Sequence, residues 1–429
     1  MKIRDLHQLF LKSKGVTTDT RSLTPSTLFF ALKGENFNAN NFALQALDSG
    51  ASYCIIDEVQ TPMNERFILV DNVLQTLQEL ANFHRKYLDI PVVALTGSNG
   101  KTTTKELINA VLIQQYNTHA TQGNYNNHIG VPLTLLQMDK TTEIGIVEMG
   151  ANHAGEIAQL CEIASPNYGY ITNFGKAHLE GFGSEEGVVK AKSELYDYLK
   201  RNKGAIFVNI DDKKQVKQIG DYQNIKTFSS ENTSDFTIKL ENDRSFVNVK
   251  VDDVCIQTQL LGQYNFTNIA AAISIGLYFK LKLDVIKKGI ESYVPKNNRS
   301  QVIKQNSNTI IMDAYNANPT SVEAALHNFK AMNSEEKVVI LGDMFELGPQ
   351  SFHEHQAIIS MVKDFDFTKA YFVGSHFFNH QKEFPFAFFF KNVAAVKKHI
   401  KNTSIKNTLI LVKGSRRMAL ECILDMFKS

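Results

Sequence analysis

A short glycine-bearing loop between a predicted strand and a predicted helix constrains this chain most. Residues 96–104 read Thr-Gly-Ser-Asn-Gly-Lys-Thr-Thr-Thr; the apolar run 92–95 precedes them, and a helical pattern covers 101–114. Gly97 and Gly100 let the backbone N–H groups turn inward, because glycine reaches positive φ without steric cost. The N-terminus of the helix adds partial positive charge at the same place. The sequence therefore predicts a phosphate-binding loop at the carboxyl end of a strand in an α/β sheet.

The loop predicts binding of ATP with magnesium. Lys101 supplies a full positive charge near the β and γ phosphates, and the hydroxyl of Thr102 is placed to hold Mg²⁺. The general pattern has a glycine where this chain has Leu95, so the loop is a shorter variant. The residues predicted to contact the nucleotide here are Gly97, Ser98, Asn99, Gly100, Lys101, Thr102 and Thr103.

Composition excludes several classes of protein. The 429 residues predict two or three domains, and 43% hydrophobic with 21% charged residues is typical of a globular protein. A formal charge of +2, without a basic stripe, argues against nucleic acid as a partner. No run of about 18 apolar residues exists, so we expect no stable membrane insertion. Four scattered cysteines predict neither a disulfide framework nor a thiolate metal site, which suits a reducing cytoplasm.

Pattern divides the chain into three α/β domains, predicted at 1–88, 89–297 and 298–429. The central one alternates strands and helices, which predicts a mostly parallel sheet covered on both faces. Residues 225–260 alternate polar and apolar positions, which predicts an antiparallel patch. The aromatic run 384–390 predicts a buried strand. His353-Glu-His355 lacks zinc spacing and is interpreted as a transition from loop to helix.

Further candidates follow from position. Glu148 ends the predicted strand 144–147, beside the phosphate loop, where a carboxylate is a natural magnesium ligand. Asn265 and Asn268 lie one helical turn apart, so both amides can point toward one ligand. Taken alone, His178 is an ordinary surface or core residue and Lys192 a solvated lysine of an amphipathic helix.

Ordered segments along almost the whole chain change that interpretation. They include Gly-Asn-Tyr-Asn-Asn-His-Ile-Gly-Val-Pro at 123–132, Ala-His-Leu-Glu-Gly-Phe-Gly-Ser at 177–184, Asp-Ala-Tyr-Asn-Ala-Asn-Pro at 313–319 and Leu-Gly-Asp-Met-Phe-Glu-Leu-Gly at 341–348. With the loop at 96–104, they resemble the Mur ligase family. These are ATP-dependent, amide-forming enzymes of peptidoglycan assembly, and folylpolyglutamate synthases are their relatives. The segments at 313–319 and 341–348 look most like the members that add D-alanyl-D-alanine.

The resemblance implies a role for each candidate. It implies that Lys101, His178, Lys192 and Arg299 act in catalysis, and that two Mg²⁺ ions are held with Thr102, Glu148, His178 and Lys192. Lys192 is implied to be carbamylated by CO₂. Asn265 and Asn268 are implied to contact the adenine, Arg299 the γ-phosphate and Asp313 the ribose.

The resemblance also implies three sets of substrate contacts. The uridine nucleotide is expected at Thr20, Arg21 and Lys33 of a uridine-nucleotide-binding N-terminal domain, although the family's acidic-Gly-His stretch is replaced by Asn38-Ala-Asn here. Further contacts are expected at Asn124, Asn126 and Asn127. The last set lies in a Rossmann-like C-terminal domain that closes over ATP and receives the dipeptide: Asn316, Asn318, Lys413 and Ser415.

The implied reaction joins D-alanyl-D-alanine to UDP-N-acetylmuramoyl-tripeptide through an acyl phosphate, in a monomeric enzyme. Three alternatives stay open: another ligase of the family that adds one amino acid, or glutamate to folate; a P-loop kinase or switch-type NTPase; and a non-catalytic nucleotide-binding module. The chain has no Asp-Asn-Pro-Arg run, which argues against the ligase that adds the third residue.

Overall fold

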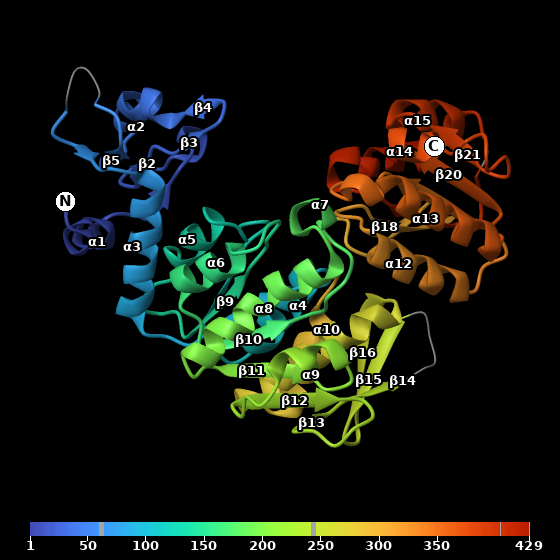
Figure 1. Cartoon of the computed structure of the whole chain (residues 1–429), viewed down its shortest axis with the longest axis horizontal. Coiled ribbons are helices and arrows are strands. Elements are labelled where there is room, and N and C mark those ends of the chain that lie inside the picture. Colours follow the sequence, from blue (N-terminus) through green and yellow to red (C-terminus); the bar gives the residue numbers. More distant parts are fainter. Residues whose placement is uncertain (60–63, 242–245, 404, 429) are drawn as a thin grey trace.

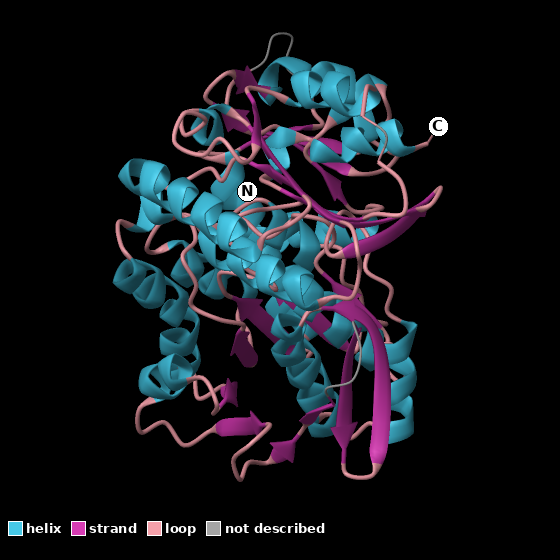
Figure 2. Ribbon diagram, turned by 90° about the vertical axis from the view of Figure 1, so that its right-hand side faces the viewer, coloured by secondary structure: helices cyan, strands magenta, loops and turns pink. Residues whose placement is uncertain are grey.

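The computed structural model describes residues 1–59, 64–241, 246–403 and 405–428, which form three α/β units in a row. The N-terminal and C-terminal units lie at opposite ends of the molecule, with the central unit between them (Figure 1). The view turned by 90° shows helices packed against strands through the molecule (Figure 2). No described helix is long and apolar enough to cross a membrane.

The N-terminal unit is built on a parallel sheet of order β1-β2-β5-β6. Phe29, Cys54 and Ile56 face α2, whereas Phe30 and Ile55 alternate to the opposite face and pack with α1 and α3. The element bounds are α1 (Ile3–Lys12), β1 (Val16–Thr17), β2 (Leu28–Phe30), β3 (Lys33–Gly34), β4 (Phe37–Asn38), α2 (Ala43–Asp48), β5 (Tyr53–Ile56), β6 (Phe67–Leu69) and α3 (Val73–Leu88). Helix α3 also contacts α5 (Gly130–Leu135) and α6 (Glu156–Ala164), so it joins this unit to the central one.

Seven parallel strands in the order β13-β12-β11-β10-β7-β9-β8 form the core of the central unit. The bounds of its strands are β7 (Val92–Thr96), β8 (Thr118–Ala120), β9 (Ile144–Glu148), β10 (Tyr168–Ile171), β11 (Ala205–Asn209), β12 (Ile225–Ser229) and β13 (Phe236–Thr237). The bounds of its helices are α4 (Lys101–Leu112), α5 (Gly130–Leu135), α6 (Glu156–Ala164), α7 (Leu179–Phe182), α8 (Glu185–Arg201), α9 (Lys213–Ile219), α10 (Phe266–Tyr278) and α11 (Leu283–Ser292).

Both faces of this sheet are covered, as the continuous apolar runs of its strands predict. Val93 and Leu95 pack with α4, α10 and α11, whereas Val92 and Ala94 pack on the other face with α5, α6 and α8. Every residue of β7 and β9 is buried. The phosphate-binding loop therefore leaves the centre of a rigid sheet.

The expected antiparallel patch at 225–260 is only partly correct. An antiparallel sheet of β14 (Lys239–Glu241), β15 (Phe246–Val251) and β16 (Val254–Leu261) does form. However, β12 and β13 extend the parallel sheet instead. Both patterns alternate, so periodicity could not separate an edge strand of the parallel sheet from a hairpin.

The C-terminal unit has a six-stranded sheet of order β17-β18-β22-β19-β20-β21, parallel except for the hairpin that β17 makes with β18. Its helices α12 and α13 cover one face, and α15 covers the other with the final turns of the chain. The bounds are β17 (Gln301–Gln305), β18 (Asn308–Asp313), α12 (Pro319–Ala331), β19 (Lys337–Gly342), α13 (Ser351–Phe365), β20 (Lys369–Val373), α14 (Ser375–Phe378), β21 (Phe388–Phe390), α15 (Val393–Lys401) and β22 (Leu409–Lys413).

The prediction of a buried strand over 384–390 is wrong. Only Phe388–Phe390 forms a strand, β21, and it is the edge strand of the sheet, paired on one side with β20. Phe386 and Phe388 are 43% and 42% exposed. The proline at 385 lacks a backbone N–H and prevents a longer strand, and an edge position leaves part of each ring in solvent. His353-Glu-His355 lies in the first turns of α13, as interpreted.

Candidate active site

The phosphate-binding loop has the backbone geometry that its glycines predict. Gly97 has φ 145° and Gly100 has φ 78°. A Cβ atom at Gly97 would lie 2.0 Å from Oγ1 of Thr172, and one at Gly100 would lie 2.5 Å from Oδ1 of Asn268. Both glycines are therefore required by sterics as well as by backbone conformation.

A second segment, which follows β10, holds the loop in place. The backbone N–H of Ser98 donates to the carbonyl of Asn173 at 3.1 Å, and its hydroxyl donates to the carbonyl of Gly175 at 2.8 Å. The backbone N–H of Asn99 donates to Oδ1 of Asn173 at 3.1 Å, while the Thr172 hydroxyl donates to the Asn99 carbonyl at 2.5 Å. The loop is thus preformed by adjacent parallel strands, β7 and β10.

Lys101 is the first residue of α4, and its side chain folds back over the loop. Nζ donates to the carbonyl oxygen of Gly97 at 2.7 Å and to that of Ser98 at 3.3 Å. Burial lowers the pKa of Lys101, and nearby Arg299 lowers it further, whereas Glu148 raises it. Lys101, Arg299 and Glu148 are therefore electrostatic neighbours at this edge of the sheet, although they come from distant parts of the sequence. Thr103 is nearly buried in the first turn of α4.

Glu148 ends β9 and is only 1% exposed. Its Oε1 accepts from the Thr102 hydroxyl at 3.3 Å and from Nδ2 of Asn126 at 2.8 Å, while Oε2 has no hydrogen-bond partner although it is buried. A buried carboxylate oxygen without a partner is costly unless a cation compensates it. Thr102 and Glu148 therefore fit a magnesium ion, whose hard charge prefers such oxygen ligands.

This donor set is small. The described residues contain no group of three or more His, Cys, Asp or Glu side chains arranged to hold a metal on their own. A magnesium ion at Thr102 and Glu148 would therefore need oxygen atoms from phosphates or water, as is usual for Mg²⁺ beside a nucleotide.

The three asparagines predicted to contact substrate have separate positions. Asn126 is committed to Glu148, and its backbone carbonyl accepts from the N–H of Gly150 at 2.7 Å. Oδ1 of Asn127 accepts from the N–H groups of Ile129 and Gly130, which begins α5. Asn124 is exposed. Within this set, Asn126 is joined to Glu148 and Asn124 is open to solvent.

Lys192 is buried, which differs from the solvated lysine that its helix pattern alone predicts. It is 0% exposed, Nζ donates to the carbonyl of Ala151 at 3.2 Å, and Nζ lies 5.1 Å from the centre of the Phe182 ring. Burial lowers its pKa well below the ordinary value, Lys101 lowers it further, and Glu156 and Glu194 act against this. Burial favours the uncharged, nucleophilic amine.

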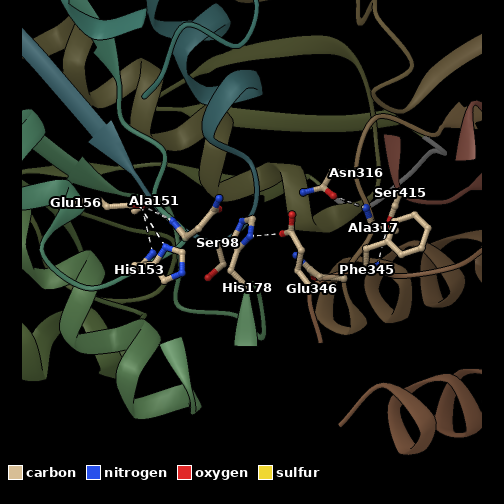
Figure 3. Close-up of polar contacts among 12 residues, drawn as sticks. Ser98, Ala151, His153, Glu156, His178, Asn316, Ala317, Phe345, Glu346 and Ser415 are labelled. Carbon is tan, nitrogen blue, oxygen red and sulfur yellow. Dashed lines mark hydrogen bonds and ion pairs between the residues drawn. The ribbon is translucent and has the colours of Figure 1, made fainter. Parts of the chain in front are cut away.

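His178 precedes α7 and meets the C-terminal unit. Its Nδ1 lies 2.5 Å from Oε2 of Glu346, and Figure 3 shows the two side chains pointing toward one another. The hydrogen bond with His178 lowers the pKa of Glu346, burial acts against this, and nearby Arg417 lowers it further. This contact crosses from the central to the C-terminal unit.

Asn265 and Asn268 are buried beneath the loop. Nδ2 of Asn268 donates to Oδ1 of Asn265 at 2.9 Å, and Oδ1 of Asn268 accepts from the hydroxyl of Thr104 at 3.0 Å. Asn265 also donates to the carbonyl of Leu261 at 2.7 Å. Their amides are close together, as predicted, but in this structure they bind each other. Arg299 is stacked over the ring of Tyr315 at 3.7 Å.

The candidates of the C-terminal unit cluster at the carboxyl ends of β18 and β22. Nζ of Lys413 forms an ion pair with Oδ2 of Asp313 at 2.6 Å and lies 3.4 Å from the carbonyl of Asn316. Asn318 caps α12, and its Nδ2 donates to Oδ1 of Asn99 at 2.8 Å. The hydroxyl of Ser415 accepts from the N–H of Phe345 at 3.1 Å. Asn318 thus connects this unit to the phosphate-binding loop.

The predicted uridine contacts do not join this centre. Arg21 pairs with Asp19 at 2.7 Å, and Lys33 pairs with Asp57 at 3.1 Å and Glu58 at 3.2 Å. Thr20 begins the short 3₁₀ turn Thr20–Ser22. All three belong to the N-terminal unit, at the opposite end of the molecule from the C-terminal unit (Figure 1).

Sequence reasoning missed three residues that organise the site. Asn173 holds the loop, Glu346 contacts His178, and Lys105 is a fully buried lysine of α4. Glu346 lies within segment 341–348, which carries the family resemblance, but the sequence predicts no role for its side chain. Asn173 and Lys105 carry no signal of their own, because their roles arise from contacts with distant residues.

Two family models match the chain. The Mur ligase middle domain matches residues 95–276, and the glutamate ligase domain of Mur ligases matches residues 298–416.

Curated relatives match over almost the whole chain. The UDP-N-acetylmuramoyl-tripeptide–D-alanyl-D-alanine ligase of Bacillus subtilis (strain 168) is 38% identical, covering 97% of this chain and 93% of the relative. The ligase of the same name from Escherichia coli (strain K12) is 34% identical, covering 95% and 92%. Among solved structures, a MurF from Acinetobacter baumannii superimposes with a TM-score of 0.87 at 29% identity, covering 98% of each chain. The MurF ligase from Thermotoga maritima in complex with ADP gives a TM-score of 0.86 at 26% identity, covering 100% of this chain and 98% of that one.

Proposed function

This chain belongs to the Mur ligase family, and we propose that it joins D-alanyl-D-alanine to UDP-N-acetylmuramoyl-tripeptide with consumption of ATP. It is an enzyme that forms a peptide bond, and the products are ADP, phosphate and the pentapeptide precursor of peptidoglycan. Relatives that carry this activity in their names match nearly the full length of the chain.

One observation carries the proposal most directly: the contact between the C-terminal unit and the phosphate-binding loop. Nδ2 of Asn318 donates to Oδ1 of Asn99 at 2.8 Å. A kinase or switch-type NTPase has no need of a further α/β unit docked on its phosphate loop. A ligase needs one, because its second substrate must reach an activated carboxylate that water must not reach.

The first chemical step moves the γ-phosphoryl group of ATP onto the terminal carboxylate of the tripeptide, which gives an acyl phosphate and ADP. Two anions must approach each other for this to occur. Lys101 and Arg299 are the cations placed to balance their charge, and they act by positioning and electrostatic stabilisation. Magnesium, when bound at Thr102 and Glu148, neutralises phosphate charge at the same place.

In the second step, the amine of D-alanyl-D-alanine attacks the acyl carbon, and phosphate leaves from the tetrahedral intermediate. The amine loses one proton as the C–N bond forms and the C–O bond to phosphate breaks. Lys413, Asn316 and Ser415 lie on the C-terminal unit, which would carry the dipeptide toward this carbon. Asp313 and the pair Asn265–Asn268 are assigned to the ribose and adenine of ATP.

A second magnesium ion and a carbamylated Lys192 form the finer part of the proposal. The neutral amine of Lys192 attacks CO₂, a C–N bond forms as one C=O π bond of CO₂ opens, and one proton is lost to solvent, so that a neutral amine becomes an anion with two oxygen atoms. Its complete burial and lowered pKa support this chemistry. The carbamate and His178 would together hold the second ion.

The carbamate has its own test. Lys192→Ala should lose activity, and added short carboxylates such as formate or acetate should restore part of it by replacing the missing oxygen atoms. Full activity in the unrescued variant would contradict the assignment.

We further propose that Thr20, Arg21 and Lys33 contact the uridine nucleotide, and that Asn124, Asn126 and Asn127 contact the activated end of the same substrate or order the magnesium ligand beside it. One copy of the chain contains all these residues, which supports action as a monomer. The described cysteines are free thiols, which supports a cytoplasmic location.

Phosphate release tests the whole proposal. The protein is incubated with ATP, Mg²⁺ and UDP-N-acetylmuramoyl-tripeptide, with and without D-alanyl-D-alanine. We expect release that requires both substrates. Equal release without the dipeptide would favour an NTPase, and equal release with free D-alanine would favour a ligase that adds a single amino acid.

A further inference from the structure

Two loops from different units of the chain meet at His178 and Glu346. Nδ1 of His178 lies 2.5 Å from Oε2 of Glu346, and the backbone N–H of Glu180 donates to the carbonyl of Glu346 at 3.2 Å. A Cβ atom at Gly348 would lie 3.4 Å from the Cα of Glu180, which is ordinary van der Waals contact. His178 and Glu346, 168 positions apart, are thus joined by a side-chain contact, and Glu180 adds a backbone hydrogen bond to Glu346 beside it.

Each loop is fixed within its own unit. On the C-terminal side, the N–H of Phe345 donates to Oγ of Ser415 at 3.1 Å, and the N–H of Met344 donates to Nε2 of His355 at 3.1 Å. On the central side, the carbonyl of His178 accepts from the N–H groups of Gly181 and Phe182, each at 3.0 Å. The contact therefore joins two ordered structures.

Both residues have a backbone conformation that disfavours side chains. His178 has φ 52° and Glu346 has φ 64°, in the left-handed region. Such a conformation persists only where surrounding contacts determine it, and it is concentrated at functional sites. Two such residues face one another across a boundary between units, and this calls for a functional explanation.

The contact has a defined chemical consequence. A carboxylate can only accept a hydrogen bond from a neutral imidazole, so Glu346 selects the tautomer of His178 that carries its proton on Nδ1. The lone pair then lies on Nε2. In the described part of the chain, no side chain or backbone group makes a hydrogen bond with this Nε2. Carboxylates that hold a histidine in this manner fix both its tautomer and its ring orientation for metal binding.

We propose that Glu346 is the positioning residue of His178, and that docking of the C-terminal unit is what presents Nε2 of His178 to the magnesium centre. The inference rests on the proposed function for the identity of that centre. It makes the metal site dependent on a residue of the unit that receives the second substrate. The ligand set is thus incomplete until that unit is docked.

The tautomer can be measured in the ligand-free protein. Selective ¹⁵N labelling of histidine, with the signals of residue 178 assigned by their loss in His178→Ala, distinguishes a protonated Nδ1 from a protonated Nε2. We expect a protonated Nδ1 in the wild type and a shift toward protonated Nε2 in Glu346→Ala. Glu346→Gln offers an amide oxygen to the same N–H and should retain more of the wild-type tautomer than Glu346→Ala does.

The metal requirement supplies the second measurement. The Mg²⁺ concentration for half-maximal turnover should rise about tenfold or more in Glu346→Ala, the usual consequence of losing a residue that orients a metal ligand. The matched control is Glu354→Gln. Glu354 makes an ion pair between the same two units, 2.9 Å from Nζ of Lys176, and forms no hydrogen bond with His178 in the described part of the chain.

Two results would overturn the inference. One is an unchanged tautomer of His178 in folded Glu346→Ala. The other is an equal change in Glu354→Gln, which would attribute the effect to a loosened interface. If the wild type fails to ligate at all, the proposed function fails, yet the tautomer measurement still decides whether Glu346 sets His178. The two failures are therefore distinguishable.

Discussion

The phosphate-binding loop and the predicted uridine contacts show how differently two parts of one chain hold charge. At the loop, Lys101 begins α4 behind the buried strand β7, and Glu148 ends the buried strand β9 and is 1% exposed. In the N-terminal unit, Arg21 and Lys33 have more exposed side chains, 88% and 42%, and pair with Asp19 and with Asp57 and Glu58. Charges held in a dry, rigid frame act strongly, whereas solvated pairs contribute little until a ligand replaces their partners. Substitutions in the two regions should therefore have very different consequences.

The largest effect is expected at Lys101. Lys101→Ala removes a full positive charge from a preformed, partly buried site, so we expect kcat to fall by about a thousandfold or more while the protein remains folded. Phosphate release that depends on both substrates measures it, with thermal unfolding as the control for folding. A loss of less than tenfold would show that the loop is not the reactive nucleotide site.

Lys105 tests the frame beneath the loop. Nζ of this fully buried residue donates to the carbonyl of Thr121 at 2.5 Å, and the Thr121 hydroxyl accepts from the N–H of Glu148 at 3.0 Å. Lys105→Ala leaves a cavity and an unpaired carbonyl, which should lower the free energy of unfolding by about 2–4 kcal/mol. Denaturant unfolding measures the change. Lys105→Met keeps most of the packing and should lose less; equal losses would assign the whole effect to the polar contacts of Nζ, the hydrogen bond to Thr121 and the ion pair with Glu106 at 2.8 Å.

Replacing Lys192 should raise the free energy of unfolding, whereas replacing Lys105 should lower it. Burial lowers the pKa of Lys192 in the folded state, so below the ordinary lysine value of 10.5 the unfolded chain binds a proton that the folded chain does not. The free energy of unfolding therefore falls as the pH drops below 10.5. Lys192→Met should therefore be more stable than the CO₂-free wild type by about 2 kcal/mol near neutral pH. That difference should shrink as the pH rises toward 10.5. Unfolding measured at several pH values in CO₂-free buffer tests this, and a difference independent of pH would contradict it.

The smallest effect on the fold is expected at Arg21. Arg21 pairs with Asp19 in solvent, so Arg21→Ala should leave the unfolding temperature unchanged. If Arg21 binds the uridine nucleotide, KM for UDP-N-acetylmuramoyl-tripeptide should rise about three- to tenfold, with KM for ATP unaltered. Steady-state kinetics for the two substrates separate these outcomes. A parallel rise in both KM values would mean that the two regions are not independent.

The same contrast explains what could be predicted from the sequence. The strand, loop and helix at 92–114 are local in sequence, so hydrophobic period and glycine positions were sufficient to predict them. Glu148 was found because parallel strands end at a common edge. These predictions depend on backbone geometry that short segments determine by themselves.

The rest depends on pairing between distant segments. Three such pairs could not be predicted from the residues next to either partner in the sequence: Asp313 with Lys413, His178 with Glu346, and Asn126 with Glu148. The burial of Lys192 could not be predicted either, since its helix alone resembles a solvated one and α6 packs against it. For the same reason, the aromatic run 384–390 appeared to be a core strand, although its place at the sheet edge is set by β20.

The folded-back position of Lys101 has a consequence for turnover. Its ammonium group already donates to the carbonyls of Gly97 and Ser98, so these carbonyls act as intramolecular competitors of the nucleotide phosphates for that group. A tethered competitor operates at a high effective concentration and cannot be diluted away. This competition lowers the affinity for both ATP and ADP. The effect should be larger for ADP, because ADP has one phosphate fewer with which to bind Lys101. We therefore expect the carbonyls of Gly97 and Ser98 to help ADP leave the loop after the reaction.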